Sequence, residues 1–513
     1  MVDRVATTQG PWVTALLVFA WFALTAWVRP LMLPDEGRYV GVAWEMLRSG
    51  DWLVPRIDGL PFFHKPPLFY WITALSMDAF GPNALAARAA PLLGATAAVV
   101  ALSWLSRRWS AAATARSAAW VLATMPLFYV GAQFANLDML VAGCISVTIV
   151  GLADAVLGAE QGRPVTRSLM LAWVGAALGL LAKGLIGVVL PALVVGAWLV
   201  ASGRWRAVRR LLWWPGMLAF GAIAAPWFVA MQARFPAFLD YFFVVQHFKR
   251  YSQGGFNNVQ PFWFYPAVLL LLCLPWAGWA WAGARRAVAQ WSAAQPLRPL
   301  MVCWLIVVLG FFSLPQSKLI GYVLPAVPPM AWLLADALDH GGRRWWRAST
   351  ALAVALGVAA VLAIGLSGRH SAKPIGLALR QAQATGTPVV FVGTYLHDVP
   401  FYAGSTAVLH VVDDWGSPEV ALHDNWRKEL ADAAAFAPQL AAGRLVPRDR
   451  LPALLCAQPV TWLVAPMAEA PALPWLVGRP PQALADGDGL WRLERREATA
   501  AGKLSCPGTP NGG

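Results

Sequence analysis

Apolar runs long enough to cross a lipid bilayer are the feature that most limits what this chain can fold into. A transmembrane helix needs about 20 predominantly apolar residues. Hydrophobic residues make up 58% of the sequence and charged residues only 13%, which excludes a disordered chain and an ordinary soluble enzyme. We therefore predict an α-helical polytopic membrane protein with about 11 transmembrane helices. The runs lie at residues 11–30, 84–106, 112–132, 138–157, 168–186, 186–202, 211–231, 263–283, 300–314, 319–338 and 348–366.

The positive charge of the chain acts mainly as a topology signal. The formal net charge of +14 would suggest nucleic acid in a soluble protein. Short cytoplasmic loops of membrane proteins are enriched in Lys and Arg, and alternate connections here carry most of the arginines that precede residue 367. We therefore place these connections in the cytoplasm and expect no nucleic-acid partner. The outward set comprises residues 31–83, 133–138, 182–184, 232–262 and 315–318.

The region after residue 366 differs in composition from the rest. Its short β-branched runs at 388–395, 406–412 and 460–464 alternate with helical stretches such as 425–443. We predict a transmembrane domain at 1–366 and a small C-terminal soluble α/β domain with a flexible tail at 367–513. Eleven crossings place this domain in the periplasm. Cys456 and Cys506 either pair there in an oxidising compartment or stay unpaired.

Ionisable residues gather in the first outward loop, residues 31–83. Asp35 and Glu36 directly follow the first apolar run, and ionisable groups at a membrane surface mark a candidate site. The loop is expected to hold two interfacial helices, at 37–48 and 66–80. Asp35 could accept a proton from a nucleophile, and Arg38 with Lys65 could bind a phosphate. The alternative is a local Asp35–Arg38 ion pair within a solvated cap.

Other outward segments also carry ionisable side chains. Asp138 lies near a helix end, and Lys183 interrupts an apolar run, where it could simply extend toward the headgroups. The segment 241–266 mixes aromatic residues with histidine, lysine and arginine, and 313–325 is a proline-bounded break that contains another lysine and a tyrosine. This pattern suits an amphipathic lipid phosphate and also suits headgroup anchoring.

A series of short motifs runs in order along the chain. The motifs are P-D-E-x-R-Y from Pro34, K-P-P-L-x-Y-W from Lys65, N-x-D ending at Asp138, A-K-G around Lys183, H-F-x-R-Y from His247 and S-K-x-x-x-Y-x-L-P from Ser317. Each motif alone is weak, but the ordered set is specific. It resembles bacterial GT-C glycosyltransferases, the relatives of the lipid A 4-amino-4-deoxy-L-arabinose transferase and, more distantly, of the protein O-mannosyltransferases. The resemblance covers about residues 10–340.

The resemblance implies roles for individual residues. Asp35 matches the essential acidic residue, and Glu36 and Asp138 are further catalytic candidates. His64 stands where the aminoarabinose transferases usually have a glutamate that is implicated in metal binding. His64 and His247 could therefore bind a divalent ion of unknown identity. The residues expected around the carrier phosphate and the acceptor are Arg38, Tyr39, Lys65, Lys183, Arg250, Lys318 and Tyr322.

The family implies an inverting transferase that moves a sugar from a polyprenyl-phosphate carrier to a lipid A-like lipid or a glycan acceptor. The reaction is expected at the periplasmic face of the bacterial inner membrane. The chain has two fewer apolar runs than the lipid A enzyme and a shorter tail, so a different acceptor stays open. The sequence does not identify the sugar. A monomer is expected. No nucleotide cofactor is expected, since no GxGxxG or P-loop motif occurs. The alternative is a transporter or flippase for a lipid-linked substrate, which should show paired repeat halves.

Overall fold

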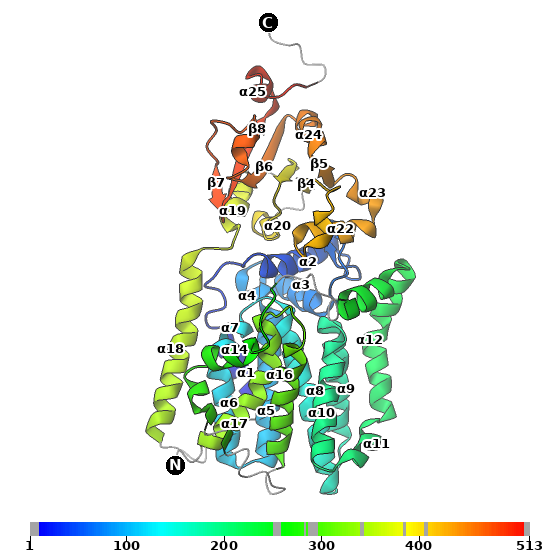
Figure 1. The fold of residues 1–513 in the computed structure, drawn as a ribbon, viewed down its shortest axis with the longest axis vertical. Coiled ribbons are helices and arrows are strands. Elements are labelled where there is room, and N and C mark those ends of the chain that lie inside the picture. The colour runs from blue at the N-terminus through cyan, green and yellow to red at the C-terminus, as the bar shows by residue number, and fades with distance from the viewer. Residues whose placement is uncertain are drawn as a thin grey trace. The chain divides into compact units, whose positions relative to one another are not determined.

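The chain folds into two compact units, each described here by itself (Figure 1). The helical unit comprises residues 1–29, 64–72 and 88–366, and the mixed unit comprises residues 30–63, 73–87 and 367–513. The first loop, which the sequence analysis assigned to the N-terminal domain, thus belongs largely to the same unit as the C-terminal region. The computed structural model describes residues 10–249, 258–281, 284–285, 296–338, 343–382, 386–404 and 409–506.

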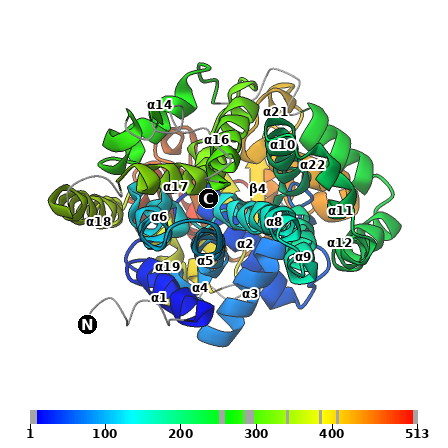
Figure 2. The ribbon, with the colours of Figure 1, turned by 90° about the horizontal axis from the view of Figure 1, so that it is seen from below.

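The helical unit is a bundle of apolar helices with α8 near its centre, flanked by α5, α9 and α10 (Figure 2). A Cβ added to Gly143 of α8 would lie 2.7 Å from the Cα of Gly94 of α5. Small residues at such crossings let two backbones approach closely, as is common between membrane helices. The α-helices are α1 (Pro11–Ala23), α5 (Ala89–Trp109), α6 (Ala112–Thr124), α7 (Pro126–Ala132), α8 (Leu137–Glu160), α9 (Thr166–Lys183), α10 (Ile186–Ala201), α11 (Val208–Leu211), α12 (Trp214–Arg234), α14 (Phe264–Leu272), α16 (Leu297–Ser313), α17 (Val327–Leu338) and α18 (Arg343–Ser367).

Shorter elements complete this unit. They are the 3₁₀ helices η2 (Trp205–Ala207), η4 (Trp276–Trp279) and η5 (Ile320–Ala326) and the π-helical stretch η3 (Asp240–Lys249). Helix α3 (Leu68–Phe80) has residues in both units. The expected run at 112–132 is divided between α6 and α7, because Pro126 cannot continue the hydrogen bonding of α6.

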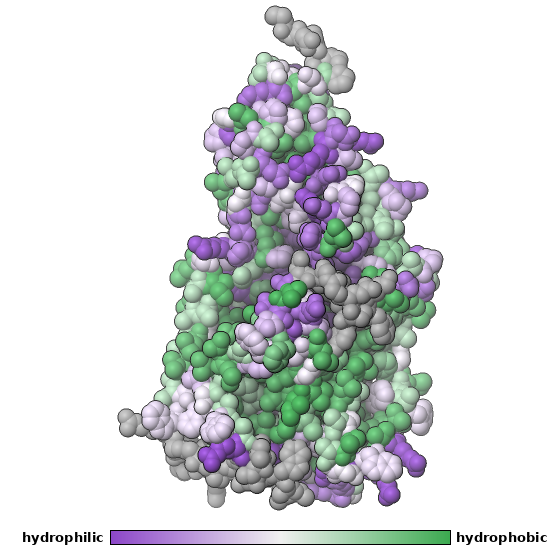
Figure 3. Space-filling view, in the orientation of Figure 1, coloured by the Kyte–Doolittle hydropathy of each residue, from purple (hydrophilic) through white to green (hydrophobic). Residues whose placement is uncertain are grey.

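The apolar helices confirm the helical membrane architecture. Within the described part of the chain, five helices are long and apolar enough to cross a bilayer. On the face shown in Figure 3, hydrophobic side chains dominate the surface of the helical unit. The total of about 11 crossings stays a prediction. The five are Ala89–Trp109, Leu137–Glu160, Trp214–Arg234, Ile320–Ala337 and Trp345–Ser367, and shorter apolar helices are Pro11–Ala23, Leu68–Phe80, Ile186–Ala201 and Leu297–Ser313.

The mixed unit contains a six-stranded sheet in the order β5-β4-β3-β6-β8-β7. Strands β5, β4, β3 and β6 are parallel, and β8 and β7 add to the β6 edge in antiparallel pairs. Strand β3 is buried along its whole length, as expected for a central parallel strand covered on both faces. The strands are β3 (Val389–Val392), β4 (Leu409–Asp413), β5 (Leu445–Pro447), β6 (Val460–Pro466), β7 (Ala483–Ala485) and β8 (Asp488–Glu494).

Short helices surround this sheet, and the loop preceding α3 adds a small hairpin of β1 (Arg56–Ile57) and β2 (Leu60–Pro61). Cys456 and Cys506, which the sequence left either paired or free, form a disulfide between positions 50 residues apart. The helices are α2 (Asp35–Ser49), α4 (Ala84–Ala87), α19 (Lys373–Gln381), α20 (Val399–Ala403), α21 (Glu419–Leu422), α22 (Trp426–Ala435), α23 (Pro438–Ala441), α24 (Leu451–Ala457) and α25 (Arg495–Ala500), with 3₁₀ turns η6 (Arg448–Arg450) and η7 (Ala470–Ala472).

Helix α2 is the amphipathic helix expected in the first loop, but its apolar face packs on protein. Trp44 on this face is only 6% exposed and makes an edge contact with Phe401 of α20. A Cβ at Gly41 would lie 2.9 Å from the carbonyl oxygen of His397, so glycine allows this close approach. Helical periodicity identifies an apolar face without identifying what covers it, and here protein side chains cover Trp44.

Candidate active site

A cavity of about 430 Å³ lies among α8, α10, α16 and η5 of the helical unit. Its walls are mostly apolar, with Ile145, Val189 and Phe312 among them. Four of the predicted site residues also line it, although they are far apart in the sequence. These are Lys65, Asp138, Lys183 and Tyr322. We call this space the lysine cavity.

Local structure fixes the charged wall of the lysine cavity. Asn136 caps α8 by accepting the backbone N–H of Asp138, and its side-chain amide donates to Asp138 Oδ2 at 3.1 Å. Lys183, the last residue of α9, forms an ion pair with Asp138. The Lys183 ammonium also lies 4.2 Å from the centre of the Tyr322 ring. The pair is therefore held on one side by a helix cap and on the other by an aromatic face.

Glycine at position 321 is required for this arrangement. A Cβ there would lie 2.7 Å from Cγ of Asp138 and still closer to one carboxylate oxygen. Lys318, in the same segment, donates instead to the backbone carbonyls of Gln260 at 2.8 Å and Pro315 at 2.5 Å. In the structure Lys318 thus ties two loops together and does not line the lysine cavity.

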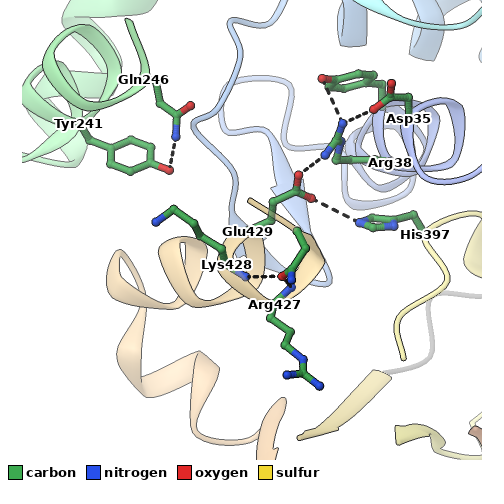
Figure 4. A network of polar contacts seen from close by, with 10 residues as sticks. Asp35, Arg38, Tyr241, Gln246, His397, Arg427, Lys428 and Glu429 are labelled. Carbon is green, nitrogen blue, oxygen red and sulfur yellow. Dashed lines mark hydrogen bonds and ion pairs between the residues drawn. The ribbon is translucent and has the colours of Figure 1, made fainter. Parts of the chain in front are cut away.

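A second polar cluster is built on α2 in the mixed unit (Figure 4). Arg38 forms ion pairs with Asp35, one helical turn earlier, and with Glu429 of α22. On the other side of Glu429, Nε2 of His397 lies 3.6 Å from its Oε2. The side chain of Asp35 is 34% exposed, whereas those of Glu429 and His397 are 5% and 3% exposed. We call Asp35, Arg38, Glu429 and His397 the α2 network.

The predicted neighbours of Asp35 on α2 have defined positions as well. Glu36 is fully buried, and its carboxylate accepts the backbone N–H of Met32, which ties down the start of the helix. The guanidinium of Arg38 lies 4.8 Å from the centre of the Tyr39 ring. The local Asp35–Arg38 pair that the sequence left as an alternative is present, and Glu429 extends it.

A second cavity, of about 310 Å³, adjoins the α2 network and is lined by Arg38 and His397. Asp58 lines it too and pairs with Arg444 at 2.9 Å, while Glu45 accepts the Gly59 N–H at 2.6 Å. Burial raises the pKa of Glu45 to about 7 and that of Asp58 to about 8. Burial likewise lowers the pKa of His397, which favours its neutral form.

Sequence reasoning missed five of these residues. Only His397 carried a signal, because the stretch 395-YLHDVPFYAG-404 resembles part of the terminal domain in the same family. The others lie in stretches without a recognisable motif, and their chemistry arises from burial and long-range pairing. The five are Glu45, Asp58, His397, Glu429 and Arg444.

The predicted metal site at His64 and His247 stays a prediction. Across the described ranges, no group of three or more His, Cys, Asp or Glu side chains could hold a metal ion. The ring of His64 lies 6.0 Å from that of Tyr241. The His247 side chain and Arg250 lie outside what the structure describes, so their predicted roles stay predictions as well.

Membrane-length apolar helices packed around a cationic, mostly apolar cavity define the class as a polytopic membrane protein. Residues 64–229 match the family model for dolichyl-phosphate-mannose-protein mannosyltransferases. The fold is similar to that of ArnT from Cupriavidus metallidurans, determined with undecaprenyl phosphate bound. The TM-score is 0.79 at 23% identity, over 94% of this chain and 97% of that one.

Two curated relatives identify the family more specifically. An undecaprenyl phosphate-alpha-4-amino-4-deoxy-L-arabinose arabinosyl transferase of Aeromonas hydrophila is 30% identical over 70% of this chain and 67% of its own length. The corresponding transferase of Erwinia tasmaniensis is 33% identical over 66% of this chain, which spans 61% of that relative's length. The chain belongs to this family of ArnT-like GT-C glycosyltransferases and is a multi-pass membrane protein.

Proposed function

We propose that this chain is an inverting glycosyltransferase that moves a sugar from a polyprenyl-phosphate carrier to a lipid or glycan acceptor. The lysine cavity carries the proposal. Its apolar walls suit a prenyl chain, and the ammonium groups of Lys65 and Lys183 suit the phosphate. The relatives, named for a sugar linked to undecaprenyl phosphate, support the same carrier class. By the same family relationship, we place the reaction at the periplasmic face of the inner membrane.

The proposed reaction is a single displacement at the anomeric carbon. The acceptor oxygen forms a bond to this carbon as the bond to the carrier phosphate breaks, so the configuration inverts. The polyprenyl phosphate leaves with the bonding electron pair, and Lys65 and Lys183 stabilise the charge that develops on it. Asp35 takes the proton from a hydroxyl acceptor. For an acceptor that is already an anionic phosphate, Asp35 would orient it instead.

Lys183 is paired with Asp138, and this pairing suits a binding role. Asp138 offsets the cost of keeping an ammonium in a largely apolar wall. Tyr322 provides a further contact that does not neutralise the lysine. An arriving phosphate would therefore meet a lysine already held in position, with little side-chain ordering left to do.

Sugar transfer by isolated membranes tests this proposal. Membranes containing the protein would receive undecaprenyl phosphate linked to radiolabelled aminoarabinose, together with lipid A. Label is expected to appear on lipid A, with undecaprenyl phosphate released in equal amount, and Asp35→Asn should lower both at least about a hundredfold. Transfer that survived in both the Asp35→Asn and the Lys65→Ala proteins would overturn the proposal. Movement of intact carrier across the membrane, without bond cleavage, would point to a flippase.

A further inference from the structure

Arg38 lies between two carboxylates, and only one of them comes from its own helix. One guanidinium nitrogen, Nη2, contacts Asp35, and the other, Nη1, contacts Glu429 of α22. Asp35 is the most exposed member of the α2 network, and Glu429 is almost fully buried. Arg38 thus connects a carboxylate that a substrate can reach with one that it cannot.

The position of Glu429 is fixed by the fold around it. Asn425 caps α22 by accepting the backbone N–H groups of Arg427 and Lys428, and the Glu429 N–H donates to the Asn425 carbonyl. On the same helix, Lys428 and Asp432 form a separate and more exposed ion pair. Glu429 is therefore a rigid anchor for Arg38, because a capped helix and near-complete burial both restrict its rotamers.

His397 fits this arrangement as an uncharged neighbour of Glu429. Its imidazole is buried and lies 3.6 Å from the Glu429 carboxylate. A neutral imidazole leaves the negative charge of Glu429 available to Arg38, whereas an imidazolium would compete for it. The guanidinium charge is consequently shared between Glu429 and Asp35.

We propose that Glu429 is a positioning residue for Asp35, acting through Arg38. Glu429 holds one side of the guanidinium, so that Arg38 contacts a single oxygen of Asp35 and leaves the other oxygen for the acceptor. It also takes up part of the positive charge that would otherwise act on Asp35 alone and weaken it as a base. This inference rests on the proposed function, in which Asp35 accepts the proton.

Steady-state sugar transfer by Glu429→Gln and Glu429→Asp proteins tests the inference. Gln keeps the shape of the side chain and removes its charge. We expect kcat to fall roughly tenfold to a hundredfold in Glu429→Gln, the loss of one charge-assisted contact, with KM for the carrier changed less than twofold. Glu429→Asp, which restores the carboxylate, should recover part of kcat. The matched control Asp432→Asn, on the same helix, should keep the wild-type rate.

A double variant distinguishes an effect of Glu429 on Asp35 from a general loss of structure or activity. In an Asp35→Asn background the proton acceptor is already gone, so adding Glu429→Gln should lower the residual rate no further. Wild-type kcat in Glu429→Gln, or an equal fractional loss in the Asp35→Asn background, would overturn the inference and leave the proposed function intact. If the wild-type protein transferred no sugar, both the proposed function and this inference would be wrong. Should Glu429→Gln not accumulate as folded protein, Glu429→Asp is compared with the wild type in both backgrounds; its shorter side chain weakens the contact with Arg38, so a smaller loss of kcat is expected, and only where Asp35 is present.

Discussion

The lysine cavity and the α2 network differ in how their charges are balanced. In the lysine cavity, the Lys183–Asp138 pair lies within apolar walls, and Lys65 adds a further cation. In the α2 network, Arg38 is shared by two carboxylates, and the adjoining cavity carries still more acids and arginines. Apolar walls with cations suit a bound lipid anion. Several charged side chains that pair with one another instead suit the holding of a reactive side chain in one orientation. Under the proposed function, carrier binding belongs to the first region and proton transfer to the second.

The largest effect is expected from Asp35→Asn. Loss of the general base should reduce kcat about 10²- to 10⁴-fold, while binding of labelled undecaprenyl phosphate to the detergent-solubilised protein stays at the wild-type level. Asp78, an exposed carboxylate on α3, provides the control, and Asp78→Asn should behave as wild type. Loss of carrier binding in Asp35→Asn would contradict the assignment of carrier binding to the lysine cavity and of proton transfer to the α2 network.

Lys65→Ala should have the next largest effect, and this effect should be on carrier binding more than on kcat. Removing one ammonium from the lysine cavity is expected to weaken carrier binding about 10- to 100-fold, which corresponds to one charge-assisted hydrogen bond. At saturating carrier, kcat should fall much less than in Asp35→Asn. An equilibrium binding curve with labelled undecaprenyl phosphate measures this, with Lys373→Ala at an exposed lysine as control. Unchanged affinity would remove Lys65 from the phosphate site.

Gly321→Ala tests the Asp138–Lys183 pair without touching either charge. The new methyl group would displace Asp138, since its Cβ would lie 2.7 Å from Cγ of that residue. We expect a loss of about 1–3 kcal/mol in unfolding free energy and several-fold weaker carrier binding. Gly310→Ala on α16 is the matched control, because a Cβ there meets nothing within 4 Å. A Gly321→Ala protein with normal stability and affinity would show that the pair is dispensable.

The smallest effect concerns pH and the cavity beside the α2 network. The pKa values of Asp58 and Glu45 rise from 3.8 and 4.5 to about 8 and about 7, so the folded state binds more protons than the unfolded state. Their contribution to stability is complete below about pH 4 and is lost as pH rises through 7 to 8. The melting temperature should therefore fall by a few degrees between pH 5 and pH 9.

Asp58→Asn should flatten this dependence of the melting temperature on pH. Asp51, in the same loop, offers the control because its pKa is lowered, so that its contribution is lost only at acid pH. Asp51→Asn should leave the slope between pH 6 and pH 9 unchanged. An unaltered slope in Asp58→Asn would mean that Asp58 is ionised in the folded protein throughout this range.

Much of the fold and part of the candidate site could be predicted from residues alone. The apolar runs coincide with helices, and the ordered motifs identified Lys65, Asp138, Lys183 and Tyr322, which line one cavity. The Asp35–Arg38 pair was also visible, because residues three apart share a helix face. Lys318 was expected beside them and instead contacts backbone carbonyls, since a motif position does not determine which way a side chain points.

The sequence by itself determined the membrane-spanning class and the residue types available for chemistry. Apolar runs that form helices and charge pairs between close neighbours are local properties. A stretch of about 20 residues is enough to recognise a membrane-spanning helix. Only the tertiary structure decided that α2 buries Trp44 against Phe401, and that Arg38 shares its charge with a glutamate 391 residues away. Such contacts depend on which distant surfaces the fold brings together, and burial then decides which charges must pair.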